Sequence, residues 1–324
     1  MRTFDADATR EALPFDRLIP ALARLFAEGC EVPPRQVLEV PDPQGAEPAT
    51  VLVMPAWVPG RCFGLKTITI APGNRRRGLP GLHATYLLND AATGVPLALI
   101  DGDELTARRT AAASALAASH LARLDARRLL VVGAGRVAAL LAEAHRAVRP
   151  IAEVRVWARR PQAAAGLAAA LAAQGMPAEP AADLSAAAHW ADIVSCATLA
   201  AEPVIHGTWL RPGSHLDLIG SFTPRMREAD DACFAGAGLW IDTAEALQKS
   251  GELLGPMSRG VFGPGDVCGT LAQLCRGERP GRAGPAQRTV FKSVGTALED
   301  LAAGMLVAGH YHAGSSQPVG GGMP

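Results

Sequence analysis

The order of apolar and polar residues divides the chain into regions with different secondary structure. Residues from about 5 to 30 follow a helical pattern that ends at Val32-Pro33-Pro34-Arg35. Residues 36–100 then alternate short β-rich runs with turn residues, and Thr93-Gly94 is typical of a hairpin turn. The β-rich runs are 49–54, 64–70, 84–88 and 96–101. This pattern predicts an antiparallel sheet.

The pattern changes at Thr106, where a long alanine-rich helix begins with Thr106 or Asp103 as its cap. From residue 129 apolar strands alternate with helices, which predicts a doubly wound parallel sheet. The strands expected are 129–132, 154–157, 192–196, 216–219 and 239–241. The run 289–295 leads into a final helix at 296–308, and residues 315–324 have the composition of a disordered tail.

Composition and charge narrow the classes of protein. With 49% hydrophobic residues, the chain can bury a large core. Acids and bases balance at 31 each, which excludes the basic surface that nucleic acids or anionic membranes require. No apolar run is long enough to span a membrane, and the N-terminus lacks the layout of a signal peptide. Six scattered cysteines predict reduced thiols in the cytoplasm, and no metal-binding spacing occurs.

The strongest chemical signal is the turn Gly133-Ala134-Gly135-Arg136-Val137-Ala138. It lies between strand 129–132 and a helix beginning near Val137, which is the context of a dinucleotide-binding turn. Gly133 permits the tight turn and Gly135 lets the backbone approach a pyrophosphate at the helix N-terminus. The alternative is a glycine turn in an ordinary α/β protein.

The end of the second strand bears on the choice of cofactor. An NAD site usually places an acid there, but this strand ends in Ala158-Arg159-Arg160. Two guanidiniums could hold a 2′-phosphate, so the sequence predicts NADPH, with NADH a weaker cofactor. Alternatively the arginines only cover a helix end. Thr198 and Leu199 follow strand 192–196, at the edge where the nicotinamide half would pass.

Lysine is rare in this chain. Only three of the 31 lysine and arginine residues are lysines, and two of them, Lys66 and Lys292, lie in glycine-flanked strings. Burial can lower the pKa of an ammonium group until it exchanges protons, which makes these lysines candidates for chemistry. Drift under codon bias is the alternative.

These strings together resemble the ornithine cyclodeaminase/μ-crystallin family over residues 30–310. Besides the glycine turn, the matching strings are Pro33-Pro34-Arg35, Gly64-Leu65-Lys66, Asp101-Gly102, Thr106-Ala107-Arg108-Arg109-Thr110, Thr198-Leu199-Ala200-Ala201-Glu202-Pro203, Asp242-Thr243 and Val290-Phe291-Lys292-Ser293-Val294-Gly295. The resemblance implies a Rossmann domain, 121–285, inserted in an antiparallel α+β domain, 1–120 plus 286–324. The second domain would bind substrate and form a homodimer.

The resemblance also implies roles for individual residues. Arg35, Lys66 and Arg109 correspond to residues that bind an amino-acid-like carboxylate, and such a cluster of cations would position the α-carbon for hydride transfer. The implied cofactor contacts are Thr110, Gly133, Gly135, Arg136, Val137, Ala158, Arg159, Arg160, Thr198, Leu199, Ile219 and Lys292.

One departure from the family pattern separates two activities. Cyclodeaminases carry an aspartate in a GGDCP string, where this chain has Gly220-Ser221-Phe222-Thr223-Pro224. Without that base, the chain is more similar to the bacterial cyclic ketimine reductases of the family. These reduce Δ1-pyrroline-2-carboxylate to proline and Δ1-piperideine-2-carboxylate to pipecolate. Lys66, or a water held by Thr223 or Ser221, is the candidate proton donor.

Three other activities stay open. Alanine dehydrogenase would use free ammonia and an acyclic keto acid. Ornithine cyclodeaminase would release ammonia. A non-catalytic NADPH-binding protein, as the crystallin relationship permits, would turn over no imine.

Overall fold

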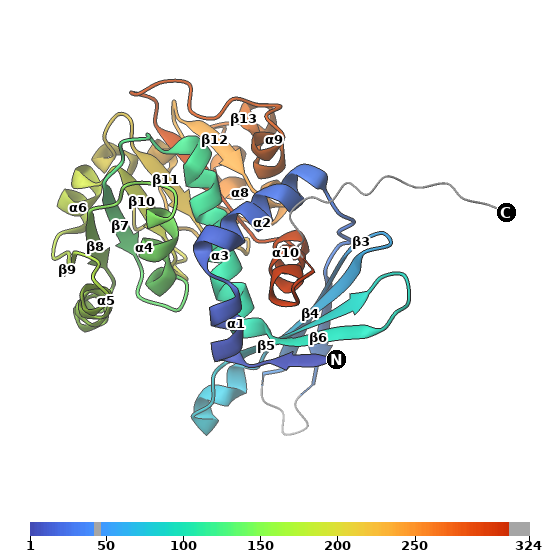
Figure 1. The fold of residues 1–324 in the computed structure, drawn as a ribbon. Helices are drawn as coiled ribbons and strands as arrows, with labels where there is room; N and C mark the ends of the chain where they lie inside the picture. Colours follow the sequence, from blue (N-terminus) through green and yellow to red (C-terminus); the bar gives the residue numbers. More distant parts are fainter. Residues whose placement is uncertain (42–46, 311–324) are drawn as a thin grey trace.

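Two sheets side by side carry the fold, and the computed structural model describes residues 1–41 and 47–310 (Figure 1). The six-stranded sheet has the order β1-β6-β5-β4-β3-β2, and the eight-stranded sheet the order β13-β12-β14-β11-β10-β7-β8-β9. The first contains β1 (Arg2–Phe4), β2 (Gln36–Val40), β3 (Ala49–Val58), β4 (Cys62–Ile70), β5 (Leu82–Asp90) and β6 (Pro96–Asp101). The predicted tail, 315–324, lies outside the described residues.

The second sheet is parallel throughout. It contains β7 (Arg128–Val132), β8 (Glu153–Trp157), β9 (Ala178–Pro180), β10 (Ile193–Cys196), β11 (His215–Leu218), β12 (Gly238–Ile241), β13 (Val267–Thr270) and β14 (Thr289–Lys292). The helices are α1 (Ala6–Ala12), α2 (Phe15–Glu28), α3 (Gly102–Leu121), α4 (Ala138–Arg146), α5 (Pro161–Ala173), α6 (Leu184–Trp190), α7 (Ala246–Lys249), α8 (Gly251–Ser258), α9 (Leu271–Cys275) and α10 (Ala297–Val307). This is the predicted fold class, a doubly wound parallel sheet beside an antiparallel one.

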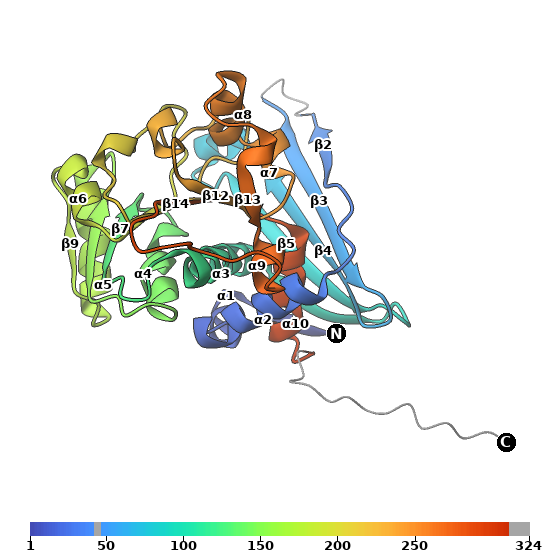
Figure 2. The ribbon, with the colours of Figure 1, turned by 90° about the horizontal axis from the view of Figure 1, so that it is seen from above.

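The six-stranded sheet is antiparallel from β2 to β6, as predicted, and Gly94 turns the β5–β6 hairpin with φ +74°. The sequence pattern did not reveal β1, which pairs with β6 in parallel. Helices α10 and α3 pack against one face of this sheet, and α2 packs against both helices (Figure 2). The face toward these helices therefore carries the buried side chains, including Lys66 on β4.

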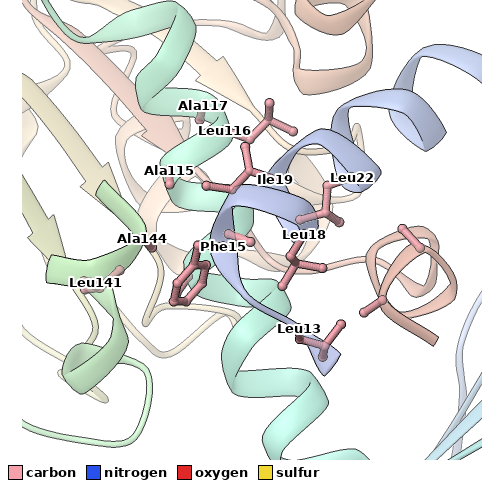
Figure 3. Packing of buried hydrophobic residues seen from close by; sticks show 14 of the residues in the cluster. Leu13, Phe15, Leu18, Ile19, Leu22, Ala115, Leu116, Ala117, Leu141 and Ala144 are labelled. Atoms are coloured by element: carbon pink, nitrogen blue, oxygen red, sulfur yellow. The ribbon is translucent and has the colours of Figure 1, made fainter. Parts of the chain in front are cut away.

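The predicted N-terminal helix, 5–30, is wrong in one respect, because it is two helices. Leu13 ends α1, and Pro14 directs the chain into α2 with an extended conformation. The apolar face of α2, with Phe15, Leu18 and Ile19, then lies on the small side chains of α3 (Figure 3). Alanines there let the helices approach closely, which ties α3 into the core.

The predicted start of α3 is also wrong. The helix begins at Gly102 and is capped by Asp101, whose carboxylate accepts a hydrogen bond from Glu104 N at 2.8 Å. Neither Thr106 nor Asp103 is the cap, because the helix starts directly at the end of β6. A Cβ at Gly102 would lie 2.5 Å from backbone atoms of Ala84 and Thr85, so this abrupt start requires glycine.

The eight-stranded sheet contains the five strands predicted for it, two short ones that were missed, β9 and β13, and also β14, whose residues the sequence analysis assigned to the other domain. At three and four residues, β9 and β13 carry no readable periodicity. Strand β14 belongs to this sheet, whereas α10 packs on the other one. The chain therefore returns to the antiparallel domain after Lys292, and not at residue 286, the predicted boundary. The strand order reverses between β7 and β10, where a doubly wound sheet forms its binding crevice.

Candidate active site

A cavity of about 650 Å³ lies at the carboxyl ends of β7, β8 and β10. Seven of the predicted cofactor residues line it: Gly133, Gly135, Ala158, Arg159, Arg160, Thr198 and Leu199. Gly133 has φ +124°, and a Cβ there would lie 2.6 Å from the carbonyl oxygen of Ala197 on the neighbouring segment. A Cβ at Gly135 would meet nothing within 4 Å, so that backbone is open to a ligand. The turn thus has the shape that a pyrophosphate requires.

The two arginines after β8 are available to a ligand. Arg159 and Arg160 line the cavity and are exposed, and within the described ranges neither forms an ion pair or a side-chain hydrogen bond. Arg155, on β8 itself, differs because it donates to Glu179 Oε1 at 2.8 Å and stacks on Trp190. Arg136 lies 3.6 Å from Asp103 and does not line the cavity. Of these three sites, only Arg159 and Arg160 combine a place in the cavity lining with the absence of an ion pair among the described residues.

Two buried carboxylates that the sequence reasoning missed hold the loops beyond the cavity. Glu228 accepts hydrogen bonds from Thr198 N, Thr198 Oγ1 and Gly220 N at 2.7–2.8 Å. Glu252 accepts from Ser221 Oγ at 2.7 Å and from the backbone of Glu228. These bonds fasten the segments after β10 and β11 to each other, and so fix the position of Thr198.

Lys292 is the positive charge that acts on this carboxylate pair. Its side chain is fully buried, and Nζ donates to the carbonyl oxygen of Leu218 at 3.0 Å. Burial lowers the pKa of Lys292, opposed mainly by Glu228 and Glu252. Burial also raises the pKa of Glu228 to about 7, and the positive charge of Lys292 opposes that rise. Lys292 does not line the cavity, so it acts on the cavity through Glu228 and the loops.

The predicted substrate residues meet at the start of α10. Lys66 Nζ lies 2.6 Å from Asp300 Oδ2, and Arg109 Nε donates to the other oxygen of Asp300 at 2.9 Å. Arg109 also forms an ion pair with Glu299. Arg35 donates to the carbonyl oxygen of Gly295 at 3.0 Å. The three cations predicted from distant parts of the sequence therefore surround one helix terminus.

Gly295 is the point at which the two arginines approach each other. Its φ is +76°, and a Cβ there would lie 2.6 Å from an Arg109 nitrogen. Asp242 holds this turn by accepting the Val294 and Gly295 N–H groups at 2.7 Å each. The glycine thus leaves room for Arg109 beside the carbonyl that Arg35 binds.

Glu299 and Asp300 were not predicted, and they change the electrostatics of the cluster. Burial lowers the pKa of Lys66 to about 8, although Asp300 opposes this by favouring the charged form. Burial alone would lower the pKa of Arg109, but Asp300 and Glu299 outweigh it and raise that pKa. Burial raises the pKa of Glu299 to about 7 against the pull of Arg109. The sequence does carry a signal for them, because two adjacent acids in an otherwise apolar helix indicate buried partners of opposite charge.

Residues 221–223, where the chain departs from the cyclodeaminase pattern, differ in whether their side chains already form hydrogen bonds. Ser221 is buried and its hydroxyl is engaged with Glu252, so it is not free to hold a water. Phe222 is 44% exposed. Thr223 is half-buried, and its carbonyl oxygen accepts from Gly251 N at 3.0 Å and from Met226 N at 3.2 Å. Its hydroxyl has no hydrogen-bond partner among the described residues. The Thr110 hydroxyl donates to the Thr106 carbonyl within α3.

The described residues offer no site for a metal ion, no helix that could span a membrane and no reactive thiol at the cavity. In residues 1–41 and 47–310, no three His, Cys, Asp or Glu side chains gather where they could hold a metal ion. No helix of those ranges combines the length and the apolar character needed to cross a bilayer. Cys196, the thiol nearest the cavity, is fully buried, and burial raises its pKa well above the usual value. It is therefore a poor nucleophile.

Comparison with known proteins agrees with this geometry. The model of the ornithine cyclodeaminase/mu-crystallin family matches residues 15–315. The Δ1-pyrroline-2-carboxylate reductase of Paracoccus denitrificans is 46% identical over 261 residues, which cover 79% of this chain and 82% of that protein.

Two solved structures share nearly the whole fold. The Δ1-pyrroline-2-carboxylate reductase of Thermococcus litoralis, in complex with NADH and L-proline, superposes with a TM-score of 0.88 at 32% identity, over 95% of this chain and 97% of that one. An archaeal alanine dehydrogenase dimer with bound NAD has a TM-score of 0.87 at 29% identity, over 95% of both chains.

Proposed function

The chain belongs to the ornithine cyclodeaminase/mu-crystallin family, and from that premise we propose that it is an NADPH-dependent reductase of cyclic 2-imino acids. It is an NAD(P)H-dependent oxidoreductase acting on carbon–nitrogen double bonds. The observation that carries the finer proposal is the buried Lys66–Asp300–Arg109 cluster in a chain with Phe222 where a cyclodeaminase has its base. The cluster can bind a carboxylate and give a proton, but no acid is present at position 222.

In this mechanism the chain's own residues position the substrate and provide the proton. The dinucleotide, when bound, supplies the hydride. Arg35 and Arg109 hold the substrate carboxylate, which fixes C2 for hydride transfer. Lys66, with its pKa near 8, gives its proton to the imine nitrogen. Glu299, with its pKa near 7, can take up a proton when the substrate carboxylate replaces it beside Arg109.

A panel of substrates tests the function. With NADPH, the protein reduces five- or six-membered cyclic ketimine carboxylates, which the loss of NADPH absorbance records. It releases no ammonia from ornithine, because phenylalanine at position 222 neither accepts nor donates a proton. Formation of ammonia and proline from ornithine would overturn the proposal in favour of a cyclodeaminase.

The similarity to the archaeal alanine dehydrogenase makes alanine dehydrogenase the second candidate activity. That activity would join pyruvate and free ammonia, so the rate with this mixture is compared with the rate with a preformed cyclic ketimine. Faster turnover of the mixture would favour the dehydrogenase. Bound NADPH without turnover of any of these compounds would identify a non-catalytic binding protein.

Cofactor choice rests on the two free arginines. Replacing Arg159 and Arg160 together by alanine raises the KM for NADPH about tenfold or more, because hydrogen bonds to a phosphate are charge-assisted. The KM for NADH changes little. Arg155→Ala is the matched control, since Arg155 lies on β8, just before the two arginines, but pairs with Glu179. Equal use of NADPH and NADH by the unmodified enzyme would contradict the phosphate assignment.

The proton donor has a testable pH dependence. Because the pKa of Lys66 is lowered to about 8, the protonated fraction and kcat/KM fall about tenfold per pH unit above that value. In Lys66→Arg the guanidinium stays charged, so a lower but flat profile is expected over the same range. An unchanged descending limb in this variant would assign the proton to another group.

We also propose a homodimer in the cytoplasm. Half-exposed apolar side chains, among them Val53 on β3, lie on the face of the six-stranded sheet that α10 and α3 leave uncovered (Figure 2). Burying such a face against a second copy would remove it from water. Light scattering should give twice the chain mass, and Val53→Lys should halve it. Leu124→Lys, at a residue 82% exposed, should leave the mass unchanged.

The unpaired cysteines support the cytoplasm as the compartment, because thiols stay reduced there.

A further inference from the structure

A second cavity, of about 420 Å³, lies at the opposite edge of the eight-stranded sheet from the cofactor cavity. Its lining comes from the end of α3, from the linker 122–125 and from the segment 282–285. These segments lead into the amino ends of β7 and β14. The second cavity is therefore separate from the dinucleotide and substrate residues.

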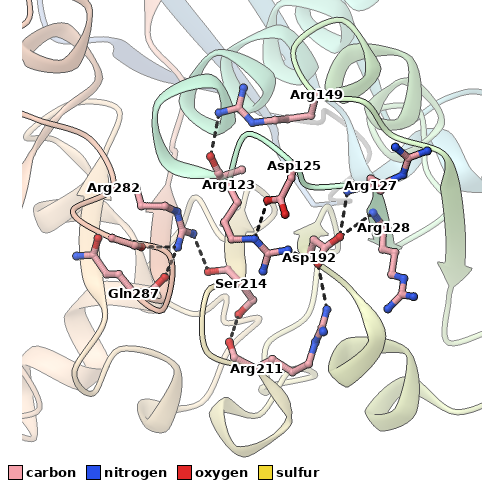
Figure 4. Close-up of polar contacts among 12 residues, drawn as sticks. Arg123, Asp125, Arg127, Arg128, Arg149, Asp192, Arg211, Ser214, Arg282 and Gln287 are labelled. Atoms are coloured by element: carbon pink, nitrogen blue, oxygen red, sulfur yellow. Dashed lines mark hydrogen bonds and ion pairs between the residues drawn. The ribbon is translucent and has the colours of Figure 1, made fainter.

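Three arginines, Arg123, Arg149 and Arg282, line this cavity. Figure 4 shows their polar contacts. Arg149 is only 7% exposed and donates to the carbonyl oxygens of Ser119 and Ala122 at 2.7 and 2.9 Å. Its Nε is buried and has no partner among the described residues. Arg282 donates to the carbonyl oxygens of Leu121 and Ser214, among other neutral groups. Neither guanidinium forms an ion pair with a carboxylate in the described part of the chain, although the charge of Asp125 acts on Arg282.

The two acids near this cavity, Asp125 and Asp192, already form ion pairs with other arginines. Arg123 pairs with Asp125 and Asp192 at 3.0 Å each, and Asp192 also accepts from Arg211 at 3.1 Å (Figure 4). Together with Arg149 and Arg282, four guanidiniums thus face two carboxylates, which leaves a net charge of +2. The carbonyl end of α3 offsets only about half an elementary charge.

The remaining positive charge affects the groups around it. The pKa of Arg282 is lowered to about 10 by burial and by repulsion from Arg123 and Arg149, which Asp125 opposes. Burial and Arg149 also lower the pKa of His120. An anion in the cavity would relieve this repulsion, because it would face guanidiniums that now have only neutral partners.

We propose that this second cavity binds the phosphate group of a small molecule, as inorganic phosphate or a phosphate monoester. A phosphate dianion matches the net charge of +2, and its oxygens accept from guanidiniums with good geometry. Arg149 lines the cavity, and its Nε has no hydrogen-bond partner among the described residues. The site is independent of the proposed imine reduction.

Thermal unfolding at constant ionic strength tests the site. The host is the Arg159→Ala/Arg160→Ala variant, so that phosphate binding in the cofactor cavity is weakened. Its Tm should rise saturably with inorganic phosphate, by about 2–4 °C at roughly ten times the dissociation constant. Ala283→Glu should abolish this rise, because Ala283 is an exposed lining residue and a carboxylate there repels the ligand. Ala283→Gln, of the same size, should retain it.

Other outcomes would overturn the proposal. If Tm does not rise with phosphate, the arginines serve only to satisfy the carbonyl end of α3. An equal rise in Ala283→Glu would place the bound phosphate elsewhere in the molecule. An equal rise with succinate would assign the cavity to dicarboxylates instead of phosphates. Glycerol phosphate, measured beside inorganic phosphate, distinguishes a monoester from the free ion.

Discussion

Arg109→Lys is expected to lower kcat/KM for cyclic ketimine reduction by roughly 30-fold to several thousand-fold. The substitution keeps a positive charge beside Asp300 and Glu299 but loses the planar fork that holds a carboxylate with two hydrogen bonds. Breaking a buried, hydrogen-bonded charge contact costs about 2–5 kcal/mol. Steady-state kinetics give the ratio, and the Kd for NADPH should change little because Arg109 does not line the cofactor cavity.

Arg108→Lys is the matched control for this prediction. Arg108 is the adjacent residue of α3, is equally buried and undergoes the same substitution. It belongs to another environment, since it donates to the carbonyl oxygen of Leu13 at 2.7 Å and lies over the ring of Phe15. Its kcat/KM should stay close to that of the unmodified enzyme. An undiminished rate in Arg109→Lys, or an equal loss in both variants, would refute the assigned role.

Asp300→Ala should lower the free energy of unfolding by about 3–5 kcal/mol, the usual effect of removing one partner from a buried ion pair. Asp300 is fully buried and faces both Lys66 and Arg109, so its loss leaves a buried ammonium without its nearest counter-charge. Urea unfolding measures the change. Glu245→Ala is the control, because Glu245 is 37% exposed where it pairs with Arg35 and Lys249, and such a surface pair contributes less than about 1 kcal/mol.

A double variant identifies the cause of the Asp300 effect. If the stranded charge of Lys66 is responsible, Lys66→Met in the Asp300→Ala background should restore part of the lost stability, although each single substitution destabilises. The double-mutant cycle then gives a coupling energy between the two residues. Losses that simply add would show that Asp300 acts by packing and not by charge.

The sequence alone determined the features that depend on neighbouring residues. Strand periodicity and the glycine turn were readable because backbone sterics and side-chain alternation act over a few residues. The absence of an acid after β8 was readable for the same reason, and it directed attention to Arg159 and Arg160. The helix break at Pro14 obeys such a local rule too, so that error was avoidable.

Only the tertiary structure decided which charges meet. Lys66 and Arg109 were identified from their own strings, but their counter-charge, Asp300, lies on the last helix and reaches them because α10 packs on β4. Glu228 likewise supports Thr198 across two loops. Local pattern carries no information about such pairs, since burial, distance and hence pKa arise only when elements pack together. The fold and the glycine turn were therefore predictable from the sequence, whereas the electrostatic balance of the site was not.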